Sequence, residues 1–403
     1  MPWLPWIVSY RYAMFAGWSW LIALVWLSRV LPALRMLPRI PNLLDPAYDD
    51  ADNSTAWPSV TVIVPAKNEA AALEQSLRSL LASDYPHLAI IAVDDRSTDA
   101  TGAIMDQIAT EPDVQDRLHV LHVTELPEGW LGKPRAMALA AADVESDWLL
   151  FTDADVLFAP DAIRRAMTYA MRSQADHLVV FPTLVLRGWA EKMLIAFFQS
   201  VSALASRPWK IADPKATRDY IGVGAFNMVR RSVYDKLDGY TALRMEVLED
   251  MRFGFRVKRA GYAQRVAFGK NLLRIRWAES AWGILENLTK NLFAVFRFRV
   301  SLLLLACVGL AGLCLTPFLA LAVPDAARWA GLVTLIGLLM LNLRYWKQTR
   351  ISPLYLALFP AATLLFLITL VRSMLLVLWR GGVLWRGTLY PLKELRRHAG
   401  PLW

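Results

Sequence analysis

Trp148-Leu149-Leu150-Phe151-Thr152-Asp153-Ala154-Asp155 is the stretch from which the rest of the chain can be interpreted. It begins as a short apolar run without Gly or Pro, which is typical of a buried strand. The run ends in two carboxylates, Asp153 and Asp155, and residues spaced i, i+2 in an extended backbone point to the same side. Two such carboxylates repel each other unless a cation lies between them. The pattern therefore suggests Mg²⁺ or Mn²⁺, which take oxygen ligands and are commonly shared with substrate phosphates.

A simpler interpretation of the same two carboxylates is an acidic turn before a helix. A helix that starts near Pro160 would have Asp161 in its first turn, where negative charge is favourable. This octamer alone does not decide between a metal site and a helix cap, so the rest of the chain has to.

Apolar residues concentrate at the two ends of the chain. Of the 403 residues 56% are hydrophobic, and the excess lies outside residues 58–300. Residues 13–34 are long enough to span a bilayer, and we expect an anchor rather than a signal peptide because no small-residue cleavage site follows. After residue 300, the segment 301–323 is long enough to span, 329–343 is short, and 353–379 contains Pro360 and Arg372. We therefore expect two or three C-terminal spans.

Basic residues lie beside these apolar ends and give the chain a net charge of +9. A nucleic-acid-binding protein could share this charge, but basic clusters next to apolar segments favour cytoplasmic flanks of membrane helices. We expect an integral membrane protein of a bacterial-type inner membrane, with its middle region in the cytoplasm and no nucleic-acid partner. Three C-terminal spans would place the basic tail outside, against the positive-inside rule, so we expect either that the last segment is re-entrant or that one segment does not cross.

Short apolar strands alternate with helical patterns in the middle region. Strands are predicted at 60–65, 89–93, 118–123, 148–152 and 177–181, with helices between them. This alternation predicts an α/β fold with a parallel sheet covered on both faces. Ligands bind beyond the carboxyl ends of such strands. The polar clusters Lys67-Asn68-Glu69, Asp94-Asp95 and Asp153/Asp155 all follow strand ends, which predicts one shared site.

Two further segments allow more than one interpretation. Residues 189–209 form an apolar helix that contains Glu191 and Lys192, which favours an interfacial amphipathic helix over a core helix. Glu249 and Asp250 precede a basic helix; they could stabilise its first turn, or one of them could serve as a general base.

Taken together, the motifs resemble a membrane-integrated family 2 glycosyltransferase with a GT-A fold, similar to bacterial hopanoid, carotenoid and lipid glycosyltransferases. The resemblance covers about residues 58–300. In chain order the matching segments are Pro65-Ala66-Lys67-Asn68-Glu69, Asp94-Asp95-Arg96-Ser97-Thr98-Asp99-Ala100-Thr101, Gly132-Lys133-Pro134-Arg135-Ala136, Thr152-Asp153-Ala154-Asp155 and Glu249-Asp250. Five motifs in the family's order make coincidence a poor explanation.

The resemblance implies an inverting hexosyltransferase with a nucleotide-diphosphate sugar as donor, a UDP-sugar being expected. It implies that Asp153 and Asp155 bind Mg²⁺ or Mn²⁺ and that Asp250, beside Glu249, deprotonates the acceptor hydroxyl. The implied nucleotide-sugar-binding residues are Pro65, Ala66, Glu69, Asp94, Asp95, Lys133 and Asp153.

One family motif is missing. Polysaccharide-polymerising members carry an Arg-Trp motif after the Glu-Asp pair, whereas this chain has Glu286-Asn287-Leu288-Thr289-Lys290-Asn291 there. Lys290 is a candidate replacement as a phosphate-binding cation. The difference favours transfer of one sugar to a lipid acceptor from the bilayer over a processive polysaccharide synthase. A non-catalytic membrane scaffold is the third alternative, and it predicts loss of carboxylates that are all present.

The resemblance and the apolar pattern together predict the domain organisation. We expect a transmembrane anchor at 1–35, a linker at 36–57, a GT-A domain at 58–300, a transmembrane region at 301–380 and a basic tail at 381–403. The GT-A domain would include one interfacial helix at about 189–209 and a second at about 280–298.

Overall fold

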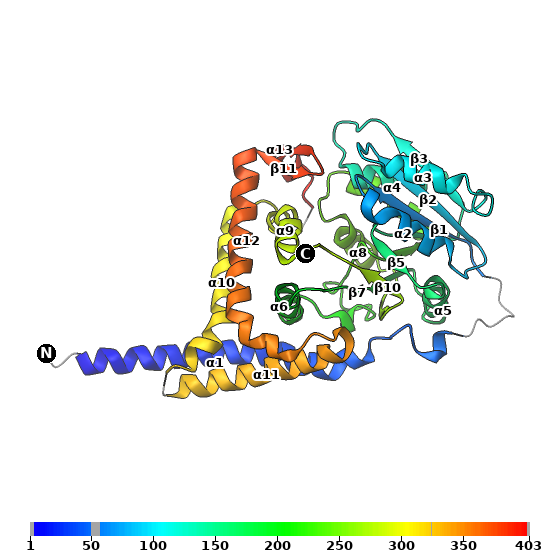
Figure 1. The fold of residues 1–403 in the computed structure, drawn as a ribbon. Coiled ribbons are helices and arrows are strands. Elements are labelled where there is room, and N and C mark those ends of the chain that lie inside the picture. Colours follow the sequence, from blue (N-terminus) through cyan, green and yellow to red (C-terminus); the bar gives the residue numbers. More distant parts are fainter. Residues whose placement is uncertain (1–3, 50–56, 324, 401–403) are drawn as a thin grey trace. The chain divides into compact units, whose positions relative to one another are not determined.

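The computed structural model describes residues 4–49, 57–323 and 325–400, which form two compact units (Figure 1). The sheet unit contains Ile40–Val185, Pro208–Trp277 and the segment from Arg380 onward. The helical unit contains the described residues up to Arg39, together with Leu186–Arg207 and Ala278–Trp379. Residues 50–56 of the expected linker lie outside the described residues.

A seven-stranded sheet in the order β3-β2-β1-β4-β8-β6-β9 forms the centre of the sheet unit. Only β8 runs antiparallel to its neighbours β4 and β6; every other pairing is parallel. The prediction of a mostly parallel α/β sheet is therefore confirmed. The strands are β1 (Val60–Ala66), β2 (Leu88–Asp95), β3 (Leu118–Val123), β4 (Trp148–Phe151), β6 (His177–Phe181), β8 (Asn227–Arg230) and β9 (Gln264–Phe268).

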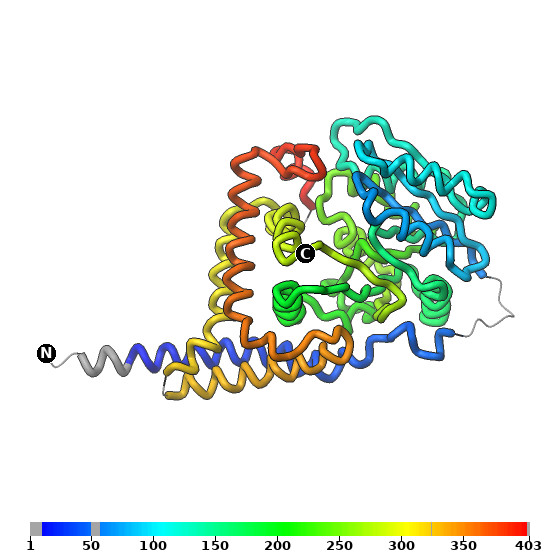
Figure 2. The backbone as a smooth tube through the Cα atoms, in the orientation of Figure 1, coloured from blue at the N-terminus to red at the C-terminus, as the bar shows by residue number. Residues whose placement is uncertain are grey.

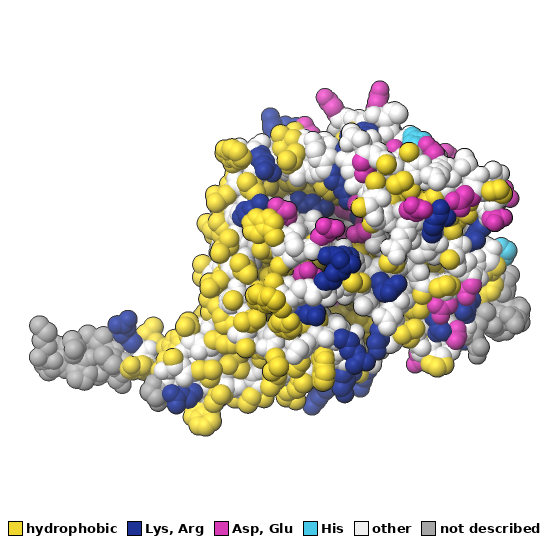
Figure 3. Space-filling model, viewed as in Figure 1, with side chains coloured by type: hydrophobic (Ala, Val, Ile, Leu, Met, Phe, Trp, Pro, Cys, Tyr) yellow, Lys and Arg dark blue, Asp and Glu magenta, His cyan; other side chains and the backbone are white. Residues whose placement is uncertain are grey.

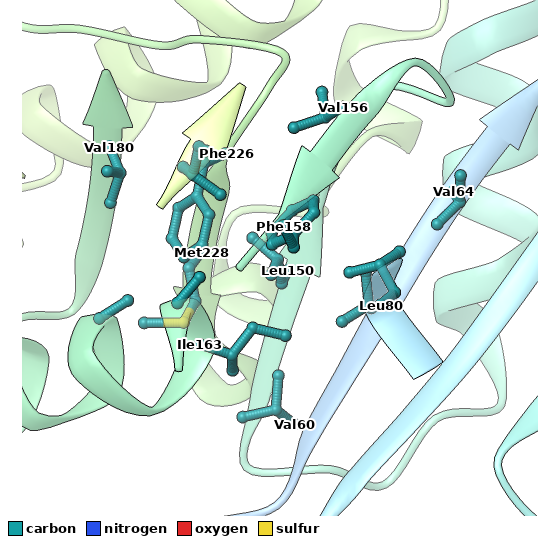
Figure 4. Close-up of a cluster of buried hydrophobic side chains, with 14 of the residues drawn as sticks. Val60, Val64, Leu80, Leu150, Val156, Phe158, Ile163, Val180, Phe226 and Met228 are labelled. Atoms are coloured by element: carbon teal, nitrogen blue, oxygen red, sulfur yellow. The ribbon is translucent and has the colours of Figure 1, made fainter. Parts of the chain in front are cut away.

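Hydrophobic cores cover both faces of this sheet. On β1, Val60, Val62 and Val64 pack into one core, and Ile63 packs into the other. This alternation follows from the two-residue period of a strand. Figure 4 shows the first core, in which Leu80, Leu150 of β4, and Val60 and Val64 of β1 are labelled. The covering helices are α2 (Ala70–Leu81), α3 (Thr101–Ala109), α4 (Gly132–Ala142), α5 (Ala162–Arg172), α7 (Arg231–Lys236) and α8 (Glu249–Arg259).

A second sheet follows directly after the two carboxylates Asp153 and Asp155. It has three strands in the order β5-β10-β7, namely β5 (Val156–Phe158), β10 (Leu273–Ile275) and β7 (Thr183–Leu184). Because β5 separates the carboxylates from α5, Asp153 and Asp155 lie in a strand-to-strand turn. The helix-cap interpretation of these two residues is therefore wrong, and only Asp161 lies at the start of α5.

The helical unit contains α1 (Leu4–Met36), α6 (Trp189–Ala205), α9 (Ala281–Val295), α10 (Val300–Ala320), α11 (Ala326–Thr349) and α12 (Phe359–Arg380). Among the described residues, four segments are long and apolar enough to cross a membrane: Tyr10–Arg39, Val300–Ala320, Ala326–Thr349 and Pro353–Arg380. The segment expected to be short, 329–343, thus lies within a helix of 24 residues. The expected interfacial segments 189–209 and 280–298 form α6 and α9.

Helices α1 and α11 lie side by side, and both run crosswise to α10 and α12 (Figure 1). The indole Nε1 of Trp26 on α1 donates to the Leu313 carbonyl of α10 at 2.8 Å. Hydrophobic side chains gather over α10 and α12 in Figure 3, and Leu305, Val308 and Trp379 are 70%, 72% and 81% exposed. Such an apolar surface is stable when lipid covers it.

After α12 the chain returns to the sheet unit (Figure 2, red). It forms an antiparallel hairpin of β11 (Gly382–Trp385) and β12 (Thr388–Pro391), followed by α13 (Leu392–His398). The segment predicted only as a basic tail is therefore folded within its described residues.

Candidate active site

The ends of β1 and β2 bring two of the polar clusters together. Ala66 pairs with Asp94 in the register of these parallel strands, so the residues that follow them meet. The turn after β1 contains Asn68, whose backbone N–H donates to Ser97 Oγ at 3.0 Å and whose Oδ1 accepts from the Thr98 N–H at 2.8 Å. Pro65, Ala66 and Glu69 are thereby fixed beside the loop that follows Asp95.

Asp94 and Asp95 point in different directions, as consecutive residues at a strand end do. Asp94 Oδ1 accepts from the Ser97 N–H at 3.1 Å, and its Oδ2 lies 3.2 Å from His122 Nδ1. The other ring nitrogen of His122 lies 2.9 Å from Asp106, and hydrogen bonds to Asp106 and Asp94 raise the pKa of His122. Asp95 is buried and pairs with Arg96, Nε to Oδ1, at 2.8 Å.

Lys133 joins three motifs that are far apart in the sequence. It lies in the first turn of α4, and its Nζ is 2.7 Å from Asp153 Oδ1 and 2.7 Å from Glu249 Oε1. Burial alone would lower the pKa of Lys133, but Asp153, Glu249 and Asp250 hold it well above its ordinary value. The ammonium group therefore stays charged and is the central cation of the site.

Asp153 and Asp155 lie in the turn between β4 and β5. The Asp153 N–H donates to the Gly224 carbonyl at 3.0 Å. The pKa of Asp155 is raised to about 7 by burial first and then by the charges of Asp153 and Glu69. The two carboxylates therefore lie close enough for the charge of Asp153 to disfavour ionisation of Asp155.

The donor set fits Mg²⁺ or Mn²⁺ shared with a substrate. Among the described residues no group of three or more His, Cys, Asp or Glu side chains could hold a metal by itself. Two carboxylates are what such a metal takes from a protein when phosphate oxygens and water supply the remaining ligands.

Glu249 and Asp250 lie in the first turn of α8, but their environments differ. Glu249 is buried against Lys133, whereas Asp250 Oδ1 accepts from the Met251 N–H at 2.6 Å. Asp250 thus bonds within its helix turn, as the helix-cap interpretation expects, and still lies beside the charged cluster. Burial and then Glu249 raise the pKa of Asp250 to about 6, against the opposite effect of Lys133.

Two glycines allow this close packing. A Cβ atom on Gly222 would lie 1.8 Å from the Asp250 carbonyl oxygen, and one on Gly224 would lie 2.5 Å from Asp153 Oδ2. The loop before β8 therefore packs against both carboxylate-bearing segments, which requires glycine at these positions.

Lys290 is the one predicted site residue that belongs to the other unit. It lies on α9 of the helical unit, whereas all the other predicted site residues belong to the sheet unit.

Sequence analysis missed the residues that the C-terminal hairpin contributes. Arg386 forms an ion pair with Glu69, and the Gly132 N–H donates to the Tyr390 hydroxyl at 3.2 Å. Their only sequence signal is the short Trp385-Arg386-Gly387 turn, which by itself does not indicate where the hairpin packs.

The sequence around this site matches a known family. Residues 61–238 match Glycosyl transferase family 2. The chain carries a family 2 glycosyltransferase domain. This transferase domain contains every strand end described above, and the match confirms the predicted family and, with the mixed sheet, the GT-A-like fold.

Named relatives of the transferase domain are bacterial glycosyltransferases. The chain is 31% identical over 157 residues to a beta-monoglucosyldiacylglycerol synthase of Synechocystis sp., covering 38% of this chain and 32% of that protein. It is 25% identical over 289 residues to a 4,4'-diaponeurosporenoate glycosyltransferase of Staphylococcus haemolyticus, covering 68% and 72%. The chain spans half or less of other relatives, such as 49% of the probable glycosyltransferase YdaM of Bacillus subtilis.

One solved structure whose chain aligns with this one is the mannosyltransferase PcManGT from Pyrobaculum calidifontis in complex with GDP-Man and Mn²⁺. It is 19% identical, with a TM-score of 0.49, and the alignment covers 91% of this chain and 99% of that one.

Proposed function

We propose that the chain transfers one sugar from a nucleotide-diphosphate sugar to the hydroxyl group of a lipid acceptor, with inversion at the anomeric carbon. The observation that carries the proposal is the cluster in which Lys133 bridges Asp153 and Glu249 beside Asp250. Together with Asp155, which follows Asp153 by two residues, this cluster combines a fixed cation, two carboxylates suited to a metal (Asp153 and Asp155) and a third, Asp250, suited to accept a proton. These are the groups that a diphosphate leaving group and a hydroxyl nucleophile require.

The proposed reaction is a single displacement. The acceptor oxygen forms a bond to the anomeric carbon while the bond from that carbon to the diphosphate oxygen breaks. Asp250 takes the proton of the acceptor hydroxyl, and the nucleoside diphosphate departs with the bonding electron pair. Mg²⁺ or Mn²⁺, held by Asp153 and Asp155, would supply charge neutralisation for that diphosphate. Lys133 holds Asp153 and adds a positive charge on the same side.

The donor would bind at the edge formed by β1 and β2. Pro65, Ala66 and Glu69 end one strand, and Asp94 and Asp95 end the other. These groups suit the base and ribose of the nucleotide, and UDP-sugars are the donors to test first. Lys290 remains a candidate phosphate-binding cation, and substitution of Lys290 would test this role.

A lipid acceptor is supported by the chain's own helices and by two relatives. Four segments of the described residues are long and apolar enough to cross a membrane. The names of the two relatives specify a glucosyldiacylglycerol and a diaponeurosporenoate, both of them membrane-soluble molecules. We propose that the helical unit is embedded in a bacterial-type inner membrane and that the sheet unit works at its cytoplasmic face.

The test is release of nucleoside diphosphate by the detergent-purified chain from a panel of nucleotide sugars, with lipid extract as acceptor. Release is expected to need Mn²⁺ or Mg²⁺, to stop with a chelator and to rise with lipid. Asp250→Asn should lower the rate at least about 100-fold, because the general base is lost. Asp113→Asn removes an exposed carboxylate that belongs to none of the motifs and should leave the rate unchanged. Absence of both release and nucleotide-sugar binding would sink the proposal.

A further inference from the structure

The C-terminal hairpin places an arginine in an unfavourable backbone conformation. The register pairs Trp385 with Thr388, so Arg386 and Gly387 form a two-residue turn. Both have positive φ, 47° and 77°, as in the tight hairpin turns that favour Asn-Gly. A long cationic side chain is uncommon at the first of these positions, and such an exception points to a function for the side chain.

That side chain reaches the predicted donor edge. The Arg386 guanidinium donates to the Lys67 carbonyl and to Glu69 Oε1, both in the turn after β1. Thr388 Oγ1 accepts from Lys67 Nζ at 3.4 Å. The hairpin therefore packs against the first of the five motifs, although more than 300 residues separate the two segments in sequence.

A second anchor holds the hairpin to two more motifs. The Tyr390 hydroxyl accepts from the Gly132 N–H, which opens α4 directly before Lys133, and it also bonds to Arg96 after β2. Tyr390 is 6% exposed, so this contact is buried. The hairpin thus joins the ends of β1 and β2 and the start of α4, the three places where the donor is proposed to bind.

Arg386 has a carboxylate partner, Glu69, in the turn after β1. A diphosphate has anionic oxygens of the same kind and can compete with this carboxylate for the guanidinium. Of the other cations at this edge, Arg96 pairs with Asp95, and Lys133 pairs with Asp153 and Glu249. Lys67 Nζ donates to Thr388 of the same hairpin. Arg386 is half-exposed, so its guanidinium can exchange one carboxylate oxygen for phosphate oxygens, which match its planar fork.

We infer that hairpin β11–β12 is part of the donor site and that Arg386 binds the diphosphate of the nucleotide sugar. The inference rests on the proposed function and deepens it. It assigns to Arg386 the phosphate-binding role for which sequence analysis offered Lys290. Tyr390 is then a positioning residue, because it holds the hairpin without touching the donor itself.

Binding to the full-length chain in detergent with Mn²⁺ tests this inference. The dissociation constants of UDP and GDP, and of the corresponding nucleosides, are measured for the unchanged chain and for Arg386→Ala, Arg386→Lys and Arg397→Ala. Arg397 is an exposed arginine of α13, so its variant removes the same charge from the same segment. Arg386→Ala is expected to weaken binding of the preferred diphosphate about 10- to 100-fold, as loss of a charge-assisted bond does, and to leave nucleoside binding within about twofold.

Arg386→Lys should recover part of this loss, and Arg397→Ala should match the unchanged chain. Equal weakening of diphosphate and nucleoside would overturn the inference, because Arg386 would then act only by holding Glu69. Unchanged diphosphate affinity in Arg386→Ala would overturn it as well, with the proposed function intact. If the unchanged chain binds neither diphosphate, both the proposed function and the inference fail.

Discussion

Lys133 is the residue on which the electrostatics of the site depend. It lies 2.7 Å from both Asp153 and Glu249, and its charge also lowers the pKa of Asp250. Without this ammonium group, the carboxylates of Asp153, Glu249 and Asp250, which come from the turn after β4 and from α8, would lie together without compensation. Such an arrangement is strongly unfavourable in a partly buried site.

Replacing Lys133 with methionine keeps the side chain's length and removes its charge. We expect the rate of sugar transfer to fall by about 100-fold or more, because a fixed cation near the leaving group is lost. The acid limb of the pH–rate profile should also move to higher pH, since Lys133 no longer lowers the pKa of Asp250. Lys236→Met removes an exposed lysine of α7 and serves as the control. A fall in rate without any movement of the acid limb would contradict this account.

Asp250 predicts a specific pH dependence. Its pKa is raised to about 6, chiefly by burial, and only the ionised carboxylate can accept the acceptor's proton. The value of kcat/KM should therefore fall about tenfold per pH unit below about pH 6 and be flat just above it. In Asp250→Asn the remaining rate should no longer fall as the pH drops below about 6. A fall that persists in the variant would assign the base to another residue.

The raised pKa of Asp250 also affects the free energy of unfolding, and this effect of pH is opposite in direction to its effect on activity. Between the ordinary pKa of an aspartate and about 6, the folded chain binds a proton at Asp250 that the unfolded chain has released. The contribution of this residue to the free energy of unfolding therefore decreases as pH rises through that window. Activity and stability should thus respond to Asp250 in opposite directions.

Sequence analysis could identify the acidic and basic residues of the site because their types are distinctive and they follow strand ends. It could not show that Lys133 bridges Asp153 and Glu249, since these residues come from α4, the turn after β4 and α8. It missed Arg386 and Tyr390 for a related reason, because a hairpin turn does not indicate the surface on which it packs.

At the scale of elements, prediction succeeded where strand and helix alternate. The strands β1, β2, β3, β4 and β6 agree with the prediction, and each of them has at least one parallel neighbour in the sheet. Strands β8 and β9 were missed. β8 has only four residues, begins and ends with polar side chains, and pairs in antiparallel orientation with β4 and β6. Its pairing depends on partners that are distant in sequence, which local periodicity does not reveal.

The loop before β8 gives an element-scale prediction. In Gly224→Ala the new Cβ would lie 2.5 Å from Asp153 Oδ2, so this carboxylate has to move. The Mn²⁺ concentration for half-maximal activity should rise about tenfold, as it does when the surroundings of a metal ligand are disturbed. Gly309→Ala, on a helix with open space around it, should behave like the unchanged chain. An unchanged Mn²⁺ requirement in Gly224→Ala would contradict the proposed role of Asp153.

Gly222 provides a contrast within the same loop. Its added Cβ would meet the backbone carbonyl of Asp250 at 1.8 Å, and a backbone atom yields less easily than a side chain. Gly222→Ala should therefore lower the yield of folded chain as well as the activity. The two variants together separate the effect of moving a carboxylate from that of moving helix α8.

At the scale of the whole molecule, the position of the tail limits how the chain can cross a membrane. The segment from Arg380 onward belongs to the sheet unit, fixed by Arg386 and Tyr390. The tail and the transferase domain must then lie on the same side of the bilayer. In the proposed membrane arrangement, an even number of the helices α10, α11 and α12 therefore crosses, which would remove the conflict with the positive-inside rule.

The hydropathy and the direction of the helices indicate which two of α10, α11 and α12 cross the bilayer. The spans that contain α10 and α12 have mean hydropathies of 2.4 and 2.3, and those of α1 and α11 are both 1.6. Because α1 and α11 run crosswise to α10 and α12, the two pairs do not share one membrane normal (Figure 1). We predict that α10 and α12 cross the bilayer and that α11 does not.

Labelling of single cysteines in intact and opened vesicles tests this topology. Cys307 and Cys314 are first replaced by serine, and cysteines are then introduced one at a time at Asp113, Ala322, Lys347 and Arg397. All four positions are exposed, and a membrane-impermeant maleimide is the probe.

Asp113 and Arg397 should be labelled from one side, and Ala322 and Lys347 from the other. Labelling of Arg397 from the side opposite to Asp113 would show that the tail and the transferase domain lie on different sides of the bilayer, against the prediction. Labelling of Lys347 from the side of Asp113 would show that α11 crosses, since the chain would then have returned before α12.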